Sequence, residues 1–236
     1  MPKKQTESMN GAMKFFTAGC VAELYLLIIR RFYVNGNINE VIAWDSYLNV
    51  FAWIGVAILA LGVALSFAWN RDKKRIIGWF VAGSGAFLAV SSFLVHWNMS
   101  TLTLLSVVVP VVMLLGIVWS LYDKECAMSL TILAASLIVL WVLYRAGSSM
   151  YTGMYVKVAA GLYLLLLGGI ALWLKRGNLQ KMVDANMDST PVYLACGISA
   201  VALAVAFVGS TVAYYAMWTL AVVVFGLAVY YTVQQL

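Results

Sequence analysis

Glu23 is the residue whose type and position are best suited to chemistry. It lies in the run 22–31, where most side chains are apolar. An ionisable group at bilayer depth is costly and rare, and it marks a site for a proton, an ion or an opposite charge. Arg30 and Arg31 follow on the same helical face, but about 10 to 12 Å further along the axis. The partner of Glu23 must therefore come from another helix, from solvent or from another chain.

Basic residues are expected on the outer side of the membrane, above Glu23. With nearby tyrosines they predict a basic, aromatic-lined mouth, formed by Arg30, Arg31, His96, Arg145 and Lys157. Simpler interpretations compete with this one. The arginines and Lys157 could end their spans by extending to the interface, and His96 could be an interface residue beside Trp97. Glu23 itself could be a protonated or hydrogen-bonded packing residue.

Enzymatic chemistry is not predicted. The single histidine excludes haem and metal sites built on several imidazoles. No pair of acids shares a helix face, and no glycine-rich loop with Lys-Ser/Thr could hold a phosphate. We therefore expect a protein without enzymatic activity, cofactor or metal.

The composition indicates a membrane protein. The 236 residues are 64% hydrophobic and 10% charged, whereas soluble domains carry about 25% charged residues. Apolar runs have the length that a helix needs to cross a bilayer, about 20 residues, and lack the alternation of a β-barrel. We predict an all-α integral membrane protein, a polytopic bundle of about eight transmembrane helices in four hairpins. The single transmembrane domain 1–236 has no soluble domain, and its spans are 12–33, 47–69, 76–97, 101–121, 127–144, 155–174, 192–209 and 212–233.

The last two spans are separated only by Gly209-Ser210. One broken helix or two helices with a turn would fit, and the turn is favoured because a single helix would reach about 63 Å.

The distribution of lysine and arginine predicts the orientation. Eight spans place both termini on one side, which holds 11 of the 15 basic residues. The positive-inside rule makes that side cytoplasmic, and the cell (plasma) membrane is the expected location. The formal charge of +6 therefore reflects topology, and no nucleic-acid partner is expected.

Small residues indicate close helix packing. The third span carries them at steps of three and four, a pattern that lets helix backbones approach closely: Gly78, Ala82, Gly85 and Ala86. The even-numbered spans share a glycine at intervals of 53 to 57 residues: Gly62, Gly116, Gly169 and Gly226. Their spacing suggests parallel repeats of a hairpin, or simply the frequency of glycine in membrane helices.

The three cysteines, Cys20, Cys126 and Cys196, have no paired spacing, and we expect free thiols in packed positions. Thr17-Ala18-Gly19-Cys20 weakly resembles a lipoprotein processing site, but the apolar region before it is too short. The first helix is expected to be a retained span.

Two functions remain. One is transport or permeation of a small solute or ion, with Glu23 as a buried proton or cation site and the outer mouth collecting an anionic or zwitterionic solute. The other is a non-catalytic membrane subunit or scaffold that binds a membrane protein partner, or forms a homo-oligomer, through intramembrane charges and short loops. Transport is slightly favoured. Either protein would contact the lipid bilayer.

Overall fold

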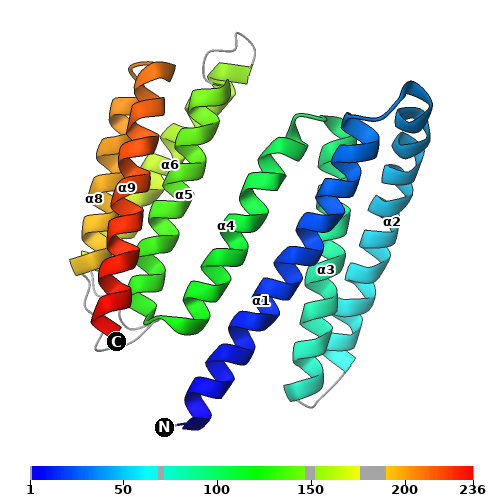
Figure 1. Cartoon of the computed structure of the whole chain (residues 1–236), viewed down its shortest axis with the longest axis horizontal. Helices are drawn as coiled ribbons and strands as arrows, with labels where there is room; N and C mark the ends of the chain where they lie inside the picture. Colours follow the sequence, from blue (N-terminus) through cyan, green and yellow to red (C-terminus); the bar gives the residue numbers. More distant parts are fainter. Residues whose placement is uncertain (1, 69–71, 147–151, 176–189, 236) are drawn as a thin grey trace. The chain divides into compact units, whose positions relative to one another are not determined.

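The chain is built of membrane-crossing helices. The computed structural model describes residues 2–68, 72–146, 152–175 and 190–235, and every element in these ranges is a helix (Figure 1). Seven of the helices are long and apolar enough to cross a membrane, and one further apolar helix has 17 residues. The predicted all-α polytopic fold is thereby confirmed. The elements are α1 (Pro2–Ile29), the π-helical η1 (Arg30–Val34), α2 (Ile38–Ala68), α3 (Asp72–Trp97), α4 (Thr101–Leu121), α5 (Lys124–Ala146), α6 (Thr152–Lys175), α8 (Thr190–Ala206) and α9 (Ser210–Gln235).

The chain turns between α8 and α9, as predicted. The Val208 N–H donates to the Val205 carbonyl at 3.2 Å, which closes the end of α8. The Ala213 N–H donates to the Gly209 carbonyl at 2.9 Å and begins α9. The apolar region 190–235 therefore forms two helices joined by a tight turn.

The start of α2 differs from the predicted span, which began at residue 47. The helix begins nine residues earlier, at Ile38. The Asn37 N–H donates to the Glu40 carboxylate at 2.8 Å, and the Val41 N–H donates to the Asn37 carbonyl at 2.9 Å. A glutamate that bonds back to the residue three positions before it is half of a capping box, a common signal for a helix start. The polar segment after η1 is therefore the first part of a helix.

The predicted orientation depends on lysines and arginines, and most of those on the predicted cytoplasmic side lie outside the described residues or have side chains that do. Arg71, Arg176 and Lys181 lie outside the described residues, and so do the side chains of Lys3, Lys4, Lys73, Lys74, Arg75 and Lys175. The orientation stays a prediction.

Contacts divide the chain into two compact units. The N-terminal unit is Thr17–Val112, and the C-terminal unit combines Met1–Phe16 with Met113–Leu236. Helices α1 and α4 each contribute to both. The single transmembrane domain stays a prediction.

The N-terminal unit is dominated by the contact between α2 and α3, which lie side by side along their length (Figure 1). A Cβ at Gly62 would lie 2.6 Å from the Cα of Ala82, and one at Gly78 would lie 2.7 Å from the backbone nitrogen of Ser66. Backbones therefore meet across this seam, as the small residues predicted. The predicted packing residues in these two helices are Gly62, Gly78, Ala82, Gly85 and Ala86.

Apolar side chains join α1 and α4 to this pair. Leu26 and Ile29 of α1 are almost fully buried in a cluster with Leu48 of α2, Val95 of α3 and Leu102 of α4. This cluster fixes which face of α1 is directed inward.

The C-terminal unit is centred on α5, which contacts α8, α9 and α6. Its core consists of large side chains, among them Leu133 and Leu140 of α5, Leu203 of α8 and Leu220 of α9, each at most 1% exposed. Side chains fill the space between these helices, in contrast to the backbone contact between α2 and α3.

The four glycines of the suggested repeat have different surroundings. Gly62 meets the backbone of α3, whereas a Cβ at Gly116 would lie 2.5 Å from the nearest ring atom of Phe15. A Cβ at Gly169 or Gly226 would meet nothing within 4 Å. The four positions share no structural role among the described residues, and a duplication gains no support from them.

Candidate functional site

Glu23 lies within the membrane-spanning part of α1, which runs over Met9–Val34 with η1. Its side chain is partly exposed, and its Oε2 atom is buried without a hydrogen-bond partner among the described residues. A carboxyl oxygen removed from solvent and left unpaired is energetically costly, more so if it is charged. Glu23 is therefore the strongest candidate for a functional group among the described residues.

The packing of α1 explains where this carboxyl lies. Leu26 and Ile29 form the buried face of the helix, while Val21 and Leu24 are 63% and 59% exposed. Glu23 lies between these two faces. It is therefore at the edge of the packed surface, with part of its side chain exposed.

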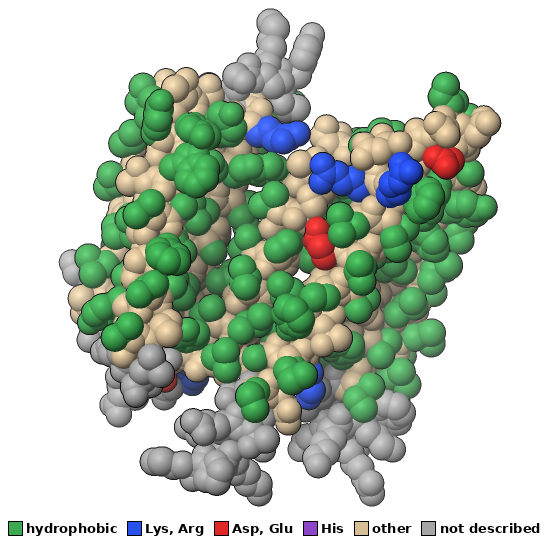
Figure 2. Space-filling view, viewed as in Figure 1, with side chains coloured by type: hydrophobic (Ala, Val, Ile, Leu, Met, Phe, Trp, Pro, Cys, Tyr) green, Lys and Arg blue, Asp and Glu red, His purple; other side chains and the backbone are tan. Residues whose placement is uncertain are grey.

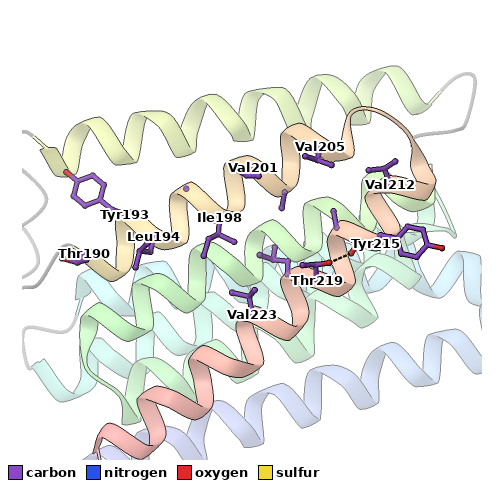
Figure 3. Close-up of a pocket in the computed structure, with 14 residues that line it drawn as sticks. Thr190, Tyr193, Leu194, Ile198, Val201, Val205, Val212, Tyr215, Thr219 and Val223 are labelled. Carbon is purple, nitrogen blue, oxygen red and sulfur yellow. Dashed lines mark hydrogen bonds between the residues drawn. The ribbon is translucent and has the colours of Figure 1, made fainter.

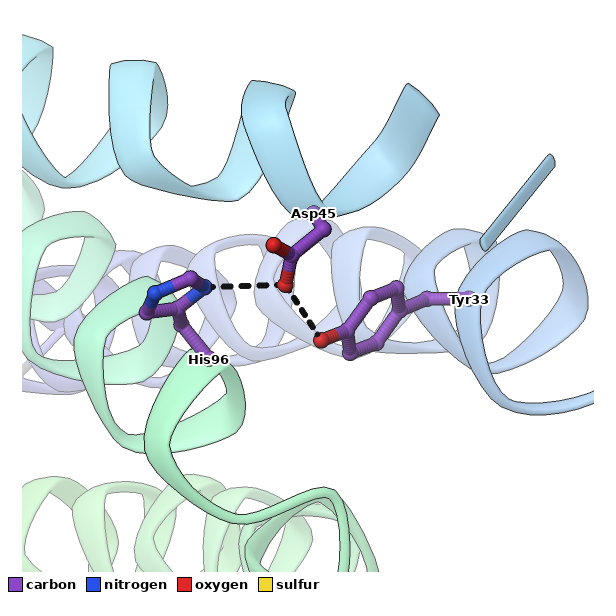
Figure 4. A network of polar contacts seen from close by, with 3 residues as sticks. All are labelled: Tyr33, Asp45 and His96. Carbon is purple, nitrogen blue, oxygen red and sulfur yellow. Dashed lines mark hydrogen bonds and ion pairs between the residues drawn. The ribbon is translucent and has the colours of Figure 1, made fainter. Parts of the chain in front are cut away.

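A polar network ties three helical elements together at the end of the N-terminal unit. The Tyr33 hydroxyl donates to Asp45 Oδ1 at 2.8 Å, and His96 Nδ1 lies 3.1 Å from the same oxygen (Figure 4). Tyr33 comes from η1, Asp45 from α2 and His96 from α3. The Asp45 and His96 side chains are 51% and 42% exposed, so this network is open to its surroundings.

The predicted mouth includes His96 but not its contact with Asp45, which also holds Tyr33. The predicted spans 12–33 and 47–69 left Asp45 between helices, whereas it lies in the second turn of α2. The spacing Asn37-x-x-Glu40 is the signal that would have extended the helix and directed Asp45 toward α3. His96 therefore contacts Asp45 in addition to lying next to Trp97 in the sequence.

Aromatic side chains accompany this network. The rings of Phe32 and Trp44 are stacked at 5.6 Å, and Tyr47 meets Trp44 edge to face at 6.1 Å. Trp44 thereby links η1 to the first turns of α2. An aromatic lining was predicted for the mouth, and it stays a prediction.

The predicted basic mouth draws on both units. Arg30 and Arg31 are exposed in η1, in the same unit as His96. Arg145, also exposed, lies over the Trp141 ring at 5.6 Å, and Lys157 is exposed on α6. These last two belong to the C-terminal unit, so a mouth made from all five residues stays a prediction.

The surface is largely apolar. Figure 2 shows a mostly hydrophobic face, with Lys and Arg side chains near the ends of the helices. Exposed large hydrophobic residues occur on every long helix. Such a surface requires lipid or other protein around it.

A second polar contact lies inside the C-terminal unit. The Tyr163 hydroxyl of α6 donates to the Ile132 carbonyl of α5 at 3.2 Å and lies 3.1 Å from the hydroxyl of Ser136, which is fully buried. These groups are uncharged and bond one another. We interpret them as a link between α5 and α6.

The three cysteines form no disulfide in the structure. Cys126 and Cys196 are buried and Cys20 is partly exposed; all three are free. Among the described residues, no three His, Cys, Asp or Glu side chains gather in a way that could hold a metal ion.

Comparison of the chain with protein-family models, with curated proteins and with solved structures found no match.

Proposed function

We propose that this polytopic membrane protein transports or conducts a small solute or ion, with Glu23 as its proton or cation site. The observation that carries the proposal is the buried, unpaired Oε2 of Glu23 in the membrane-spanning part of α1. Ionisable groups at this depth usually serve ion pathways or proton relays. A protein that only needed to pack this helix would be more stable with an apolar residue there.

Access to Glu23 also supports the proposal. The side chain is partly exposed, and it lies at the edge of the packed face of α1. A binding group for a mobile ion must be reachable and must not be permanently neutralised by a neighbouring cation. Arg30 and Arg31, about 10 Å or more along the helix, are too far away to pair with Glu23.

The outer end of the pathway would be formed by the basic and aromatic groups of η1, α2 and α3. Arg30 and Arg31 are exposed there, beside the stacked rings of Phe32 and Trp44. A basic surface of this kind raises the local concentration of anionic or zwitterionic solutes. We place the protein in the cell membrane, with both termini cytoplasmic and no catalytic step.

Flux into vesicles tests this proposal. The full chain is reconstituted in vesicles that contain a pH-sensitive dye, and a potassium gradient with valinomycin sets the membrane potential. We expect proton uptake above that of empty vesicles, or proton uptake that depends on added sodium, in the same assay. Glu23→Gln should reduce it by about 100-fold, because a positioned proton-transfer group contributes roughly that factor or more.

Two variants control for effects of folding and charge. Glu23→Asp keeps a carboxyl and should retain measurable flux. Glu40→Gln removes a carboxyl from the start of α2 but keeps an acceptor for the Asn37 N–H, and it should match the original chain. Equal flux in Glu23→Gln and the original chain would refute the role of Glu23, and flux no higher than in empty vesicles would refute transport of protons and of the cations tested.

A membrane subunit is the second candidate, favoured by the exposed apolar neighbours of Glu23. Val21 and Leu24 leave this side of α1 uncovered, so a cation on another chain could approach the carboxyl. Native mass spectrometry of the complex extracted from its own membrane would detect a stoichiometric companion. Loss of that companion in Glu23→Gln, with the helical bundle intact, would favour the subunit over the transporter.

A further inference from the structure

The C-terminal unit contains an apolar groove between α8 and α9. It has a volume of about 960 Å³ and runs from Thr190 and Tyr193, at the start of α8, to Val212 and Tyr215, beside the turn (Figure 3). Small residues, Gly197 and Ala202 on α8 and Ala216 on α9, hollow its surface. This groove takes no part in the function proposed above.

The groove forms beside α9 because α8 has a second face directed away from the core. The buried face of α8 carries Ala195, Ser199 and Leu203. The groove residues of α8 recur at steps of three and four on the other side of the helix: Thr190, Tyr193, Leu194, Gly197, Ile198, Val201, Ala202 and Val205.

Polar groups in the lining lie toward the ends of the groove or are already bonded. The Thr219 hydroxyl, which lines the groove on α9, donates to the Tyr215 carbonyl at 2.9 Å. Between the ends of α8 the lining is provided by apolar side chains such as Ile198 and Val201. The groove therefore favours a hydrocarbon occupant over a polar solute, because a polar molecule would lose hydrogen bonds to water.

The length of the groove suits a lipid chain. Residues 190 to 205 of α8 cover about 22 Å at 1.5 Å per residue. One leaflet is half of the roughly 30 Å hydrocarbon core, so an acyl chain that extends over about 15 Å fits within this length.

The groove is also continuous with surface that faces the bilayer. Leu194 and Val201 of its wall are 60% and 65% exposed, and α9 is long and apolar enough to cross the membrane. A lipid can therefore enter sideways from the bilayer. We propose that the groove between α8 and α9 is a specific binding site for an acyl chain of a membrane lipid.

Photocrosslinking of the full chain tests this site. The protein is reconstituted in phosphatidylcholine vesicles that contain a phosphatidylcholine with a diazirine in one acyl chain, and the crosslinked residues are mapped by mass spectrometry. We expect groove residues such as Ile198 and Val201 to be labelled about fivefold more than Leu165 of α6, a ratio that corresponds to about 1 kcal/mol of preference. Leu165 is 71% exposed, so it represents ordinary contact with lipid.

A matched pair of glycine variants sharpens the test. A Cβ at Gly197, inside the groove, and one at Gly169, on α6, would each meet nothing within 4 Å. Gly197→Phe should fill the groove and remove the excess labelling, whereas Gly169→Phe should leave it unchanged.

Three results would overturn the proposal. Equal labelling of the groove and Leu165 in the original chain would show ordinary lipid contact, and this result does not depend on whether a variant folds. Excess labelling that persists in a folded Gly197→Phe protein would place the lipid elsewhere. Crosslinks from the groove residues to a second protein chain, in place of lipid, would show that a helix occupies the groove.

Discussion

The α2–α3 pair and the α5-centred bundle solve the same packing problem differently. In the pair, glycines bring the backbones together, and a Cβ at Gly62 or Gly78 would collide with the opposite helix. In the bundle, leucines such as Leu133 and Leu203 fill the space between helices. Helices in lipid gain little from hydrophobic burial, so close van der Waals contact stabilises both regions. The pair leaves no room for adjustment, whereas the bundle leaves a groove between two of its helices.

The difference matters for the candidate site. The α2–α3 pair carries Asp45 on one helix and His96 on the other, and the two groups lie 3.1 Å apart. The bundle uses uncharged hydroxyls, Ser136 and Tyr163, for its polar contact. Ionisable groups are thus joined across the backbone contact of α2 and α3, and uncharged hydroxyls across the contact of α5 and α6.

The largest effect should come from adding side-chain volume to the α2–α3 seam. Gly62→Leu must push α3 away, because the contact is with the backbone of Ala82. We expect a loss of about 3 kcal/mol in the free energy of unfolding, at the upper end for an overpacked site. Gly169→Leu is the matched control, with open space around the glycine, and it should change stability by less than about 0.5 kcal/mol. Unfolding in detergent measures both, and similar losses in the two variants would contradict the comparison.

A smaller effect is expected from removing a charge from the seam. Asp45→Asn weakens the contacts to Tyr33 and His96, and we expect a loss of about 1 kcal/mol because the pair is half exposed. In the bundle, Tyr163→Phe should cost less, about 0.6 kcal/mol, the average for a hydrogen bond between membrane helices. The same unfolding measurement ranks the two variants. A larger loss for Tyr163→Phe would show that the neutral contact contributes more to the free energy of unfolding than the Asp45 contacts do.

The positions of the helices could be predicted from the sequence, but which helices lie side by side could not. Long apolar runs predicted each crossing helix, and α4 has the same bounds, Thr101–Leu121, as its predicted span. Small residues at steps of three and four predicted the close seam of α3, because only glycine and alanine permit backbone contact. The start of α2 was wrong because polar residues before an apolar run were interpreted as a loop, although Asn37 and Glu40 could cap a helix.

The surroundings of Glu23 could not be predicted for a physical reason. Hydropathy gives the depth of a residue, but its contacts depend on the rotation of its helix and on which helices lie beside it. The prediction of four hairpins did not specify which helices pack most closely, and the most extensive contact is between α2 and α3. The burial of Leu26 and Ile29 sets the rotation of α1, and from it follows the place of Glu23 at the edge of the packed face.

The most direct test of the central claim is chemical labelling of Glu23 in the membrane. A lipid-soluble carbodiimide modifies carboxyl groups that carry a proton and are reachable from the bilayer. We expect it to modify Glu23 in vesicles faster than Asp45. A sodium or proton-motive gradient that drives flux should slow the reaction, because the Glu23 carboxyl then binds sodium or loses its proton. A Glu23 that resists this reagent, while Asp45 reacts, would mean that the carboxyl is held by a partner and is not a site for a mobile ion.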